Sequence, residues 1–175
     1  GDYELKHFDS FAEMRDAILR KDQEFGLSRV LAGYAWKWLS KKSPETPDIR
    51  IDGLELFWNR TDKDWINSEN SVFEVGSIHT IQGYDLNFAG VVIGKDIGLD
   101  PKTNKLIFRR ENYFDAKGIL NNNMLGIKYS DDDILQWVLN IYRVLLTRGI
   151  KGTYIYICDD ALREHLKPFI NKVPI

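Results

Sequence analysis

The chain has 175 residues, of which 43% are hydrophobic and 29% charged, a composition typical of one globular domain with a substantial core. Its formal net charge of -2 excludes a global excess of basic residues, so any contact with a polyanion must come from a local patch. No run approaches the ~18 apolar residues of a membrane span, and the N-terminus lacks a signal-peptide pattern. We therefore expect a cytoplasmic protein with no membrane partner.

The first third of the chain predicts the order strand, helix, strand. Residues 3–8 can form a short strand, and Ser10 followed by Glu13 has the spacing of a capping box that begins a helix, which Gly26 ends. The apolar run 28–35 predicts the next strand. A further strand or hairpin arm is expected within residues 49–58, followed by an irregular segment.

The middle of the chain is more irregular. Residues 98–130 contain Pro101, several glycines and an asparagine run at 121–123, with one expected strand at 105–110. More than thirty residues without strong periodicity predict an inserted excursion or a mobile loop.

The last part of the chain again predicts helices and a strand. Ser130 and the three aspartates after it are typical of a helix N-terminus, and Gly149 ends that helix. Residues 152–158 predict a buried strand, and Asp160 can cap a last helix. Helices that alternate with apolar strands predict an α/β fold with a mainly parallel sheet covered on both faces.

Several chemistries have no support in the sequence. The chain has neither G-x-x-x-x-G-K-[ST] nor G-x-G-x-x-G, so on its own it is not expected to hydrolyse a nucleotide. Its three histidines are far apart and lack zinc-ligand spacing, so no metal site is expected. Cys158, in T-Y-I-Y-I-C, fits a buried strand residue better than a nucleophile.

Two segments remain that carry polar groups in a suggestive order. Within residues 74–94, the turn H-T-I-Q-G-Y-D separates two apolar runs, which predicts a ligand-binding rim at a strand edge. Residues 142–149 read Y-R-V-L-L-T-R-G and precede the strand G-T-Y-I-Y-I. The two segments resemble motifs V and VI of superfamily 1 helicases. With V-L-A-G-Y-A-W-K-W at 30–38, the whole chain resembles a poorly characterised bacterial family of helicase-like ATPases related to the helicase-like region of Schlafen proteins.

The resemblance implies a RecA-like, P-loop NTPase-like three-layer sandwich without its own phosphate loop. Residues 1–175 would be the second, C-terminal RecA-like domain, and its partners would be an upstream RecA-like domain of the same protein and single-stranded DNA or RNA. The parent protein would bind ATP and Mg²⁺ between the two domains and hydrolyse the ATP. This chain alone would bind neither cofactor and would be inactive.

The resemblance also implies roles for individual residues. Arg148 matches the motif VI arginine that stabilises the charge of the transferred phosphoryl group; the alternative is a cation that complements the helix dipole before Gly149. Asp85 matches the acidic position that contacts the nucleotide sugar, although glutamate is usual there. Gly83, which can allow close backbone approach or simply a tight turn, joins Gln82 and Thr147 in the implied nucleotide-binding set.

His79 and Thr80 match positions that face the nucleic-acid strand in relatives. The alternatives are a structural histidine at a strand end and a threonine that caps the following turn. Trp36, Trp38 and the tryptophans at 58 and 65 could stack on bases, but packing is the simpler interpretation.

Two functions from different classes stay open on the sequence. The first is the C-terminal motor domain of a DNA/RNA helicase-like ATPase, which could either unwind nucleic acid or move along or remodel it without separating the strands. The second is a degenerate helicase-like binding or regulatory module without ATP turnover. An upstream phosphate loop and magnesium-binding acid would separate the two.

Overall fold

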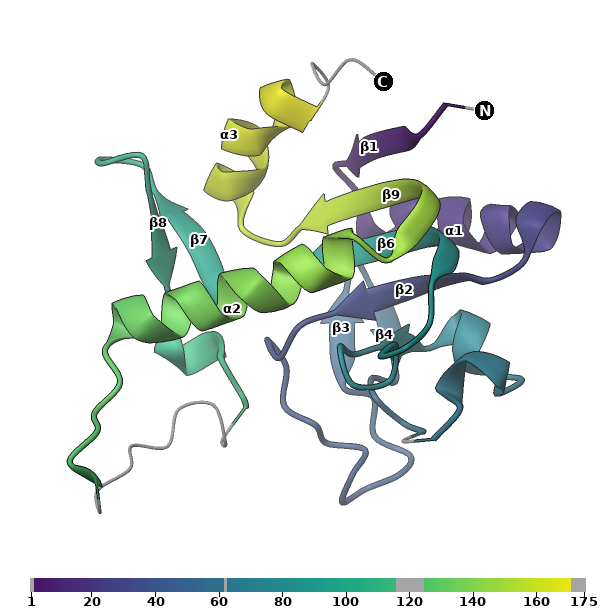
Figure 1. Cartoon of the computed structure of the whole chain (residues 1–175), viewed down its shortest axis with the longest axis horizontal. Coiled ribbons are helices and arrows are strands. Elements are labelled where there is room, and N and C mark those ends of the chain that lie inside the picture. The colour runs from purple at the N-terminus through teal and green to yellow at the C-terminus, as the bar shows by residue number, and fades with distance from the viewer. Residues whose placement is uncertain (1, 62, 116–124, 171–175) are drawn as a thin grey trace.

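The computed structural model describes residues 2–61, 63–115 and 125–170. Its centre is a five-stranded, fully parallel sheet in the order β1-β9-β6-β2-β5 (Figure 1). These strands are β1 (Glu4–Phe8), β2 (Ser28–Ala32), β5 (Val75–Gly76), β6 (Leu86–Ile93) and β9 (Gly149–Ile157).

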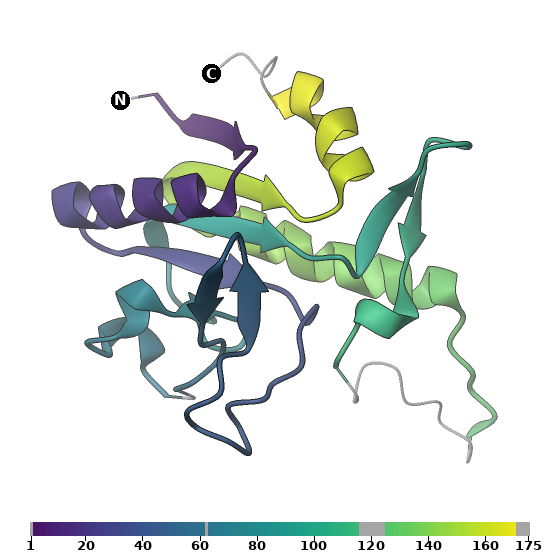
Figure 2. The same ribbon diagram turned by 180° about the vertical axis from the view of Figure 1, so that it is seen from behind.

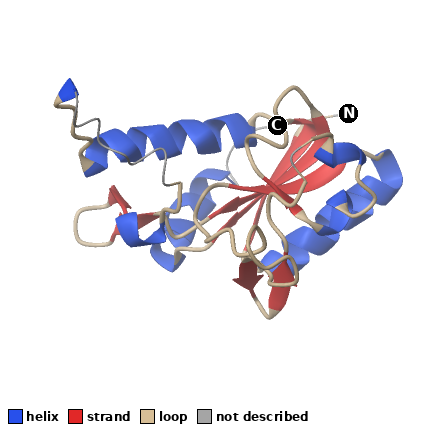
Figure 3. Cartoon of the chain, turned by 90° about the horizontal axis from the view of Figure 1, so that it is seen from below, coloured by secondary structure: helices blue, strands red, loops and turns tan. Residues whose placement is uncertain are grey.

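Helices cover both faces of this sheet. Helix α1 (Phe11–Phe25) packs on one face, while α2 (Asp131–Leu146) and α3 (Asp160–Ile170) pack on the other. Figure 2 shows the α1 face, and the view in Figure 3 separates the helices from the strands between them. The predicted α/β class and the RecA-like three-layer sandwich are confirmed.

Side-chain alternation along the strands produces two cores. In β6, Ala89, Val91 and Ile93 face α2, whereas Phe88 and Val92 face α1. A strand buried on both faces must be apolar at nearly every position, which is why β6 reads as a continuous apolar run.

The helix boundaries follow the predicted capping chemistry. At α1, Ser10 Oγ accepts a hydrogen bond from the backbone N–H of Glu13 at 3.3 Å, which is half of the predicted capping box, and Gly26 caps the helix after Phe25. At α2, the Ser130 side chain accepts from the Asp133 N–H, while the Asp133 carboxylate accepts from the Ser130 N–H at 3.0 Å. Both ends of this capping box satisfy backbone donors that the helix leaves unpaired.

Two hairpins extend from the carboxyl edge of the sheet, where the parallel strands end. β3 (Ile49–Ile51) and β4 (Leu54–Leu56) confirm the expected hairpin, and β7 (Ile97–Asp100) pairs with β8 (Lys105–Phe108). Three short 3-10 helices complete the described part: η1 (Trp65–Asn67), η2 (Ser71–Phe73) and η3 (Arg110–Asn112).

The proposed excursion at 98–130 therefore contains most of the β7–β8 hairpin and η3, and its asparagine run at 121–123 lies outside the described residues. Several strand limits differ from the prediction: β1 begins one residue later, β8 ends at Phe108 rather than at residue 110, and β9 ends at Ile157 rather than at residue 158. β2 ends at Ala32 rather than at residue 35, and β9 begins at Gly149 rather than Gly152 because Gly149 is already in register with Leu86 of β6. Among the described residues, no helix has both the length and the apolarity to cross a membrane.

Candidate nucleotide and nucleic-acid site

The polar turn predicted from the sequence is the crossover between β5 and β6, residues 77–85. Because both strands run parallel to β2, this segment must return from the carboxyl edge of the sheet to its amino edge. It crosses on the face that carries α2, where Ile81 is fully buried in the same core as Leu86 and Leu145. Its first residues thus lie near one edge of the sheet and Asp85 at the other.

The crossover meets the end of α2 at the amino edge. The backbone N–H of Leu86 donates to the carbonyl of Arg148 at 2.9 Å, and Leu86 is in register with Gly149. The two segments that resemble motifs V and VI, more than fifty residues apart in sequence, are therefore joined by a backbone hydrogen bond.

Four of the predicted site residues line one pocket of about 320 Å³. They are His79, Gln82, Gly83 and Arg148, together with the apolar residues Ile78, Ile81 and Val144. Asp85, Thr147 and Thr80 do not line this pocket. The crossover supplies one wall and the C-terminal turn of α2 supplies the other.

Arg148 is half-buried and lies directly after the helix. Its Nε donates to the carbonyl of Val144 at 3.3 Å, which holds the base of the guanidinium against the last turn. No carboxylate of the described residues lies within ion-pair distance of it. The two Nη groups are available to a ligand, while Nε bonds to the last turn of the helix. Arg148 can therefore both complement the helix end and contact a phosphoryl group.

The other nucleotide-site candidates have simpler surroundings. Gly83 has a φ of 84°, and a Cβ there would meet no heavy atom within 4 Å, so glycine is needed for the backbone conformation and not for space. Gln82 and Asp85 are exposed. The Thr147 hydroxyl donates to the carbonyl of Val144 at 2.8 Å and helps to close the helix.

The two nucleic-acid candidates differ sharply. Thr80 is buried, and its hydroxyl accepts from the Ser77 N–H at 2.7 Å and donates to the Ser77 carbonyl at 3.0 Å. These bonds make Thr80 the residue that fixes the start of the crossover. His79 is exposed, and its ring centre lies 6.0 Å from that of Tyr34, close to the carboxyl edge.

The positions of Gly83, Asp85 and Arg148 bear on the sequence argument for a binding rim. Open α/β sheets bind ligands outside the carboxyl ends of their strands. These three residues precede β6 and β9 and so lie at the amino edge. Sheet geometry alone therefore gives no reason to expect a ligand there. The evidence for a site is the contact between the two segments that resemble motifs V and VI.

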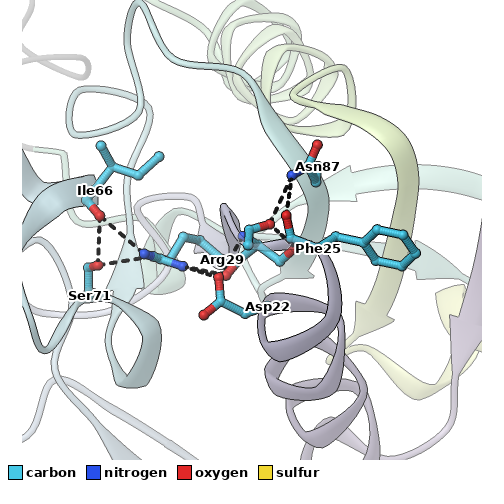
Figure 4. Close-up of polar contacts among 8 residues, drawn as sticks. Asp22, Phe25, Arg29, Ile66, Ser71 and Asn87 are labelled. Carbon is cyan, nitrogen blue, oxygen red and sulfur yellow. Dashed lines mark hydrogen bonds and ion pairs between the residues drawn. The ribbon is translucent and has the colours of Figure 1, made fainter.

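Sequence reasoning missed a buried arginine that organises the amino edge. Arg29, in β2, donates from Nη1 to Asp22 of α1 at 2.7 Å, from Nε to Ser71 at 3.0 Å and from Nη2 to the Ile66 carbonyl at 3.1 Å (Figure 4). Nearby, the Asn87 side chain donates to the carbonyls of Phe25 and Gly26. The sequence feature that could have indicated this buried arginine is a charged residue inside the otherwise apolar strand S-R-V-L-A.

The structure also decides between stacking and packing for several aromatic residues. Trp58 and Trp65 are 2% and 0% exposed, so neither can stack on a base. Trp36 and Trp38 are half-buried. Cys158 lies one residue beyond β9 rather than inside the predicted strand, and burial raises the pKa of its thiol to about 12, which keeps it protonated and unreactive at neutral pH.

The fold and the paired segments define a RecA-like α/β domain that carries helicase-type motifs. Residues 1–159 match the family model described as Schlafen group 3, DNA/RNA helicase domain, and the chain therefore belongs to this family. This membership connects it with helicase-like, nucleic-acid-related functions.

A curated relative is 33% identical over 178 residues, an alignment that covers 94% of this chain. It is the uncharacterized protein YPL245W of Saccharomyces cerevisiae, and the aligned part is 36% of that protein's length. The chain thus spans about a third of its relative. No solved structure matches the chain.

Proposed function

We propose that this chain is the second RecA-like domain of a superfamily 1-type helicase-like ATPase. In this proposal, its amino edge is one side of a nucleotide site that an upstream domain completes. The observation that carries the proposal is the pocket in which Arg148 lies beside Gln82 and Gly83.

Arg148 has the chemistry that this role requires. A guanidinium stays charged and offers planar, forked donors, which suit the oxygens of a transferred phosphoryl group. Its two Nη groups make no ion pair with the described residues, and its base is held by the Val144 carbonyl at 3.3 Å. A guanidinium that is held at its base and unpaired at its tip is prepared to act on charge supplied by a second domain.

The surface around Arg148 supports coverage by another domain. The amino edge exposes large apolar side chains at the start of three neighbouring strands: Leu27, before β2, is 48% exposed, Tyr84, before β6, 36%, and Ile150, the second residue of β9, 63%. Val144, in the pocket wall, is 37% exposed. Grouped exposed apolar residues commonly mark protein contacts, here the contact with the upstream RecA-like domain.

ATP and Mg²⁺ would be shared between the two domains in the parent protein. Arg148 would contact the phosphates, and the exposed Asp85 would contact the sugar hydroxyls. Gly83 would allow the backbone to turn next to the nucleotide. The chain has no phosphate loop, so the phosphate cradle and the magnesium ligands would come from upstream. Arg148 then stabilises the negative charge that spreads over the transferred group, which couples hydrolysis to domain closure.

Single-stranded DNA or RNA would pass the other end of the crossover. His79 is exposed there and can donate to a phosphate oxygen. Thr80 would contribute through the crossover conformation that its two bonds to Ser77 hold. His79 also lines the Arg148 pocket, whereas Asp85 does not, so in this proposal the nucleic-acid strand would pass next to the nucleotide pocket.

The test uses the full-length protein that contains this domain. Arg148→Ala should lower the ATP hydrolysis rate by about 10³-fold or more, the usual magnitude for an arginine finger, with a much smaller loss of nucleotide affinity. Steady-state hydrolysis and equilibrium nucleotide binding measure the two effects separately.

Arg143→Ala is the matched control, because Arg143 is an exposed arginine in the last turn of α2 whose side chain hydrogen-bonds only to Asn140 among the described residues. It should leave turnover unchanged. Wild-type turnover in Arg148→Ala would remove the arginine-finger role. Absence of turnover in the wild-type protein, with no upstream phosphate loop, would instead favour the degenerate binding or regulatory module.

A further inference from the structure

A second cleft lies at the carboxyl edge of the sheet, opposite the Arg148 pocket. It has a volume of about 560 Å³, within the range of small-ligand sites. Its walls come from the segments that follow β2, β6 and β9 and from the β3–β4 hairpin. The residues that carry the argument are Trp36, Lys37, Arg50, Lys95, Phe114 and Asp160.

The chain path creates this cleft. After β2 the chain passes to the α1 face, where Ile49 and Leu56 of the β3–β4 hairpin join the core of α1. After the neighbouring strand β6 it passes to the opposite face, where Ile97 and α2 share the other core. Adjacent parallel strands whose connections leave in opposite directions open a crevice at their carboxyl ends, and this is where open α/β sheets bind ligands.

The charge of the cleft favours an anion. Lys37, Arg50 and Lys95 line the cleft together with one acidic residue, Asp160. Arg50 already pairs with Glu55 at 3.3 Å and Asp160 with Arg163 at 2.6 Å, which leaves the charges of the two lysines. Lys95 is exposed and makes no ion pair with the described residues. Positive charge is therefore left over in the cleft of a chain whose net charge is -2.

The aromatic residues of the cleft favour a flat ring beside that anion. Trp36 and Phe114 both line it and are half-buried. Trp36 is seated against the end of β6: a Cβ at Gly94 would lie 2.2 Å from the Ala35 Cβ and 3.1 Å from the Trp36 ring. Lys37 Nζ lies 5.8 Å from the centre of the Phe114 ring, so a cation and an aromatic face stand side by side.

We propose that this carboxyl-edge cleft binds a nucleotide unit, with its phosphate on Lys37 and Lys95 and its base against Trp36. The same chemistry is offered by a free mononucleotide and by one nucleotide of a single strand. β9 has nine residues, so about 30 Å of strand separate the cleft from Arg148, and the inference does not rest on the proposed ATP site.

The experiment titrates the 175-residue chain with AMP and follows the backbone amides by NMR. We expect saturable shifts at residues 94–96 and 158–160, and smaller responses to adenosine or to inorganic phosphate at equal concentration. Shifts confined to residues 81–86 and 148 would overturn this inference while supporting the amino-edge site. No saturable shift would also overturn it.

Two exposed lysines provide a matched pair of variants. Lys95→Glu should weaken AMP binding by ~5–10-fold, because it replaces an attraction to phosphate with a repulsion. Lys102→Glu makes the same charge change in the β7–β8 turn, outside the cleft, and should alter affinity by less than about twofold. Equal losses in the two variants would overturn the proposal, as would loss of binding in Arg148→Ala.

A labelled oligothymidylate of about 10 nucleotides separates the two sources of the ligand. Competition between AMP and the oligonucleotide, with weaker oligonucleotide binding in Lys95→Glu, would assign the cleft to a nucleotide of a strand. AMP binding without competition would assign it to a free mononucleotide. Trp36→Leu should weaken the binding of AMP and of the oligonucleotide, provided that the variant unfolds at the same temperature as the wild type. If the variant is less stable, the result for Lys95→Glu decides whether the cleft binds the nucleotide.

Discussion

The amino and carboxyl edges of one sheet present two different kinds of surface. The amino edge has a pocket of about 320 Å³, several exposed apolar side chains, and the guanidinium of Arg148, which makes no ion pair with the residues that the structure describes. The carboxyl edge has a larger cleft of about 560 Å³ with three cationic residues and two half-buried aromatic residues. The first surface suits contact with another protein domain, and the second suits direct contact with a small anionic ligand.

The two edges point to function in different ways. At the amino edge, the residues resemble helicase motifs, but sheet geometry gives no reason to expect a ligand. At the carboxyl edge, the crevice between β2 and β6 is where a ligand is expected, but the proposed ligand rests on side-chain chemistry and not on a motif. Variants that affect one edge at a time can separate the two.

The largest effect on stability is expected from the amino edge. Arg29→Ala leaves Asp22 without its ion pair and removes the bonds to Ser71 and Ile66, so we expect a loss of about 3–5 kcal/mol of unfolding free energy. Urea unfolding at neutral pH measures this loss.

Arg50→Ala is the control at the carboxyl edge. Arg50 pairs with Glu55 at 3.3 Å, but both side chains are more than half exposed, so its loss should cost less than about 1 kcal/mol. Similar losses in the two variants would mean that Arg29 does not hold the amino edge as its bonds imply.

A smaller effect is expected at the carboxyl edge from Gly94→Ala. The new Cβ would overlap the Ala35 Cβ at 2.2 Å, so the variant should lose about 1–3 kcal/mol through overpacking and should also weaken AMP binding by moving Trp36. Thermal unfolding and the AMP titration give the two readouts.

The double variant Gly94→Ala, Ala35→Gly removes the overlapping methyl group. It should recover part of the lost stability in a double-mutant cycle. Additive losses in the cycle would show that the contact between the two residues is not the cause.

The sequence predicted local structure well where one residue acts on its neighbours. Ser10, Gly26 and Ser130 mark helix ends through bonds that span a few positions, and the apolar run of β6 reports burial on both faces. The bonds of Arg29 to residues about forty positions away could not be predicted, because nothing in the sequence states which segment covers the strand.

The same limit applies to the candidate sites. The motif resemblance placed Gln82, Gly83, Asp85, Thr147 and Arg148 in one nucleotide site. Gln82, Gly83 and Arg148 line one pocket, which His79 also lines, whereas Asp85 and Thr147 do not. The resemblance did not indicate that the Thr80 hydroxyl forms both of its hydrogen bonds with the backbone of Ser77. The carboxyl-edge cleft was invisible in the sequence, because Trp36, Lys95 and Phe114 belong to three separate segments that only the sheet brings together.

The smallest effect is a pH dependence at the carboxyl edge, from the fully buried Asp96. Its Oδ1 accepts from the Tyr142 hydroxyl at 2.7 Å, while Oδ2 has no partner among the described residues. Burial raises the pKa of this carboxyl to about 7, and the bond from Tyr142 opposes the rise only in part.

Because the folded-state pKa of Asp96 lies above its value of about 4 in the unfolded chain, its contribution to stability is fully present below pH 4. That contribution is lost as the pH rises through about 7. Between pH 6 and pH 8 the free energy of unfolding should fall by about 1 kcal/mol from this group. Asp96→Asn removes the titration, so the difference between wild type and variant in urea unfolding at the two pH values isolates it from the histidines. An equal pH dependence in both proteins would mean that Asp96 is already ionised in the folded state at pH 6 and that the carboxyl edge tolerates a buried charge.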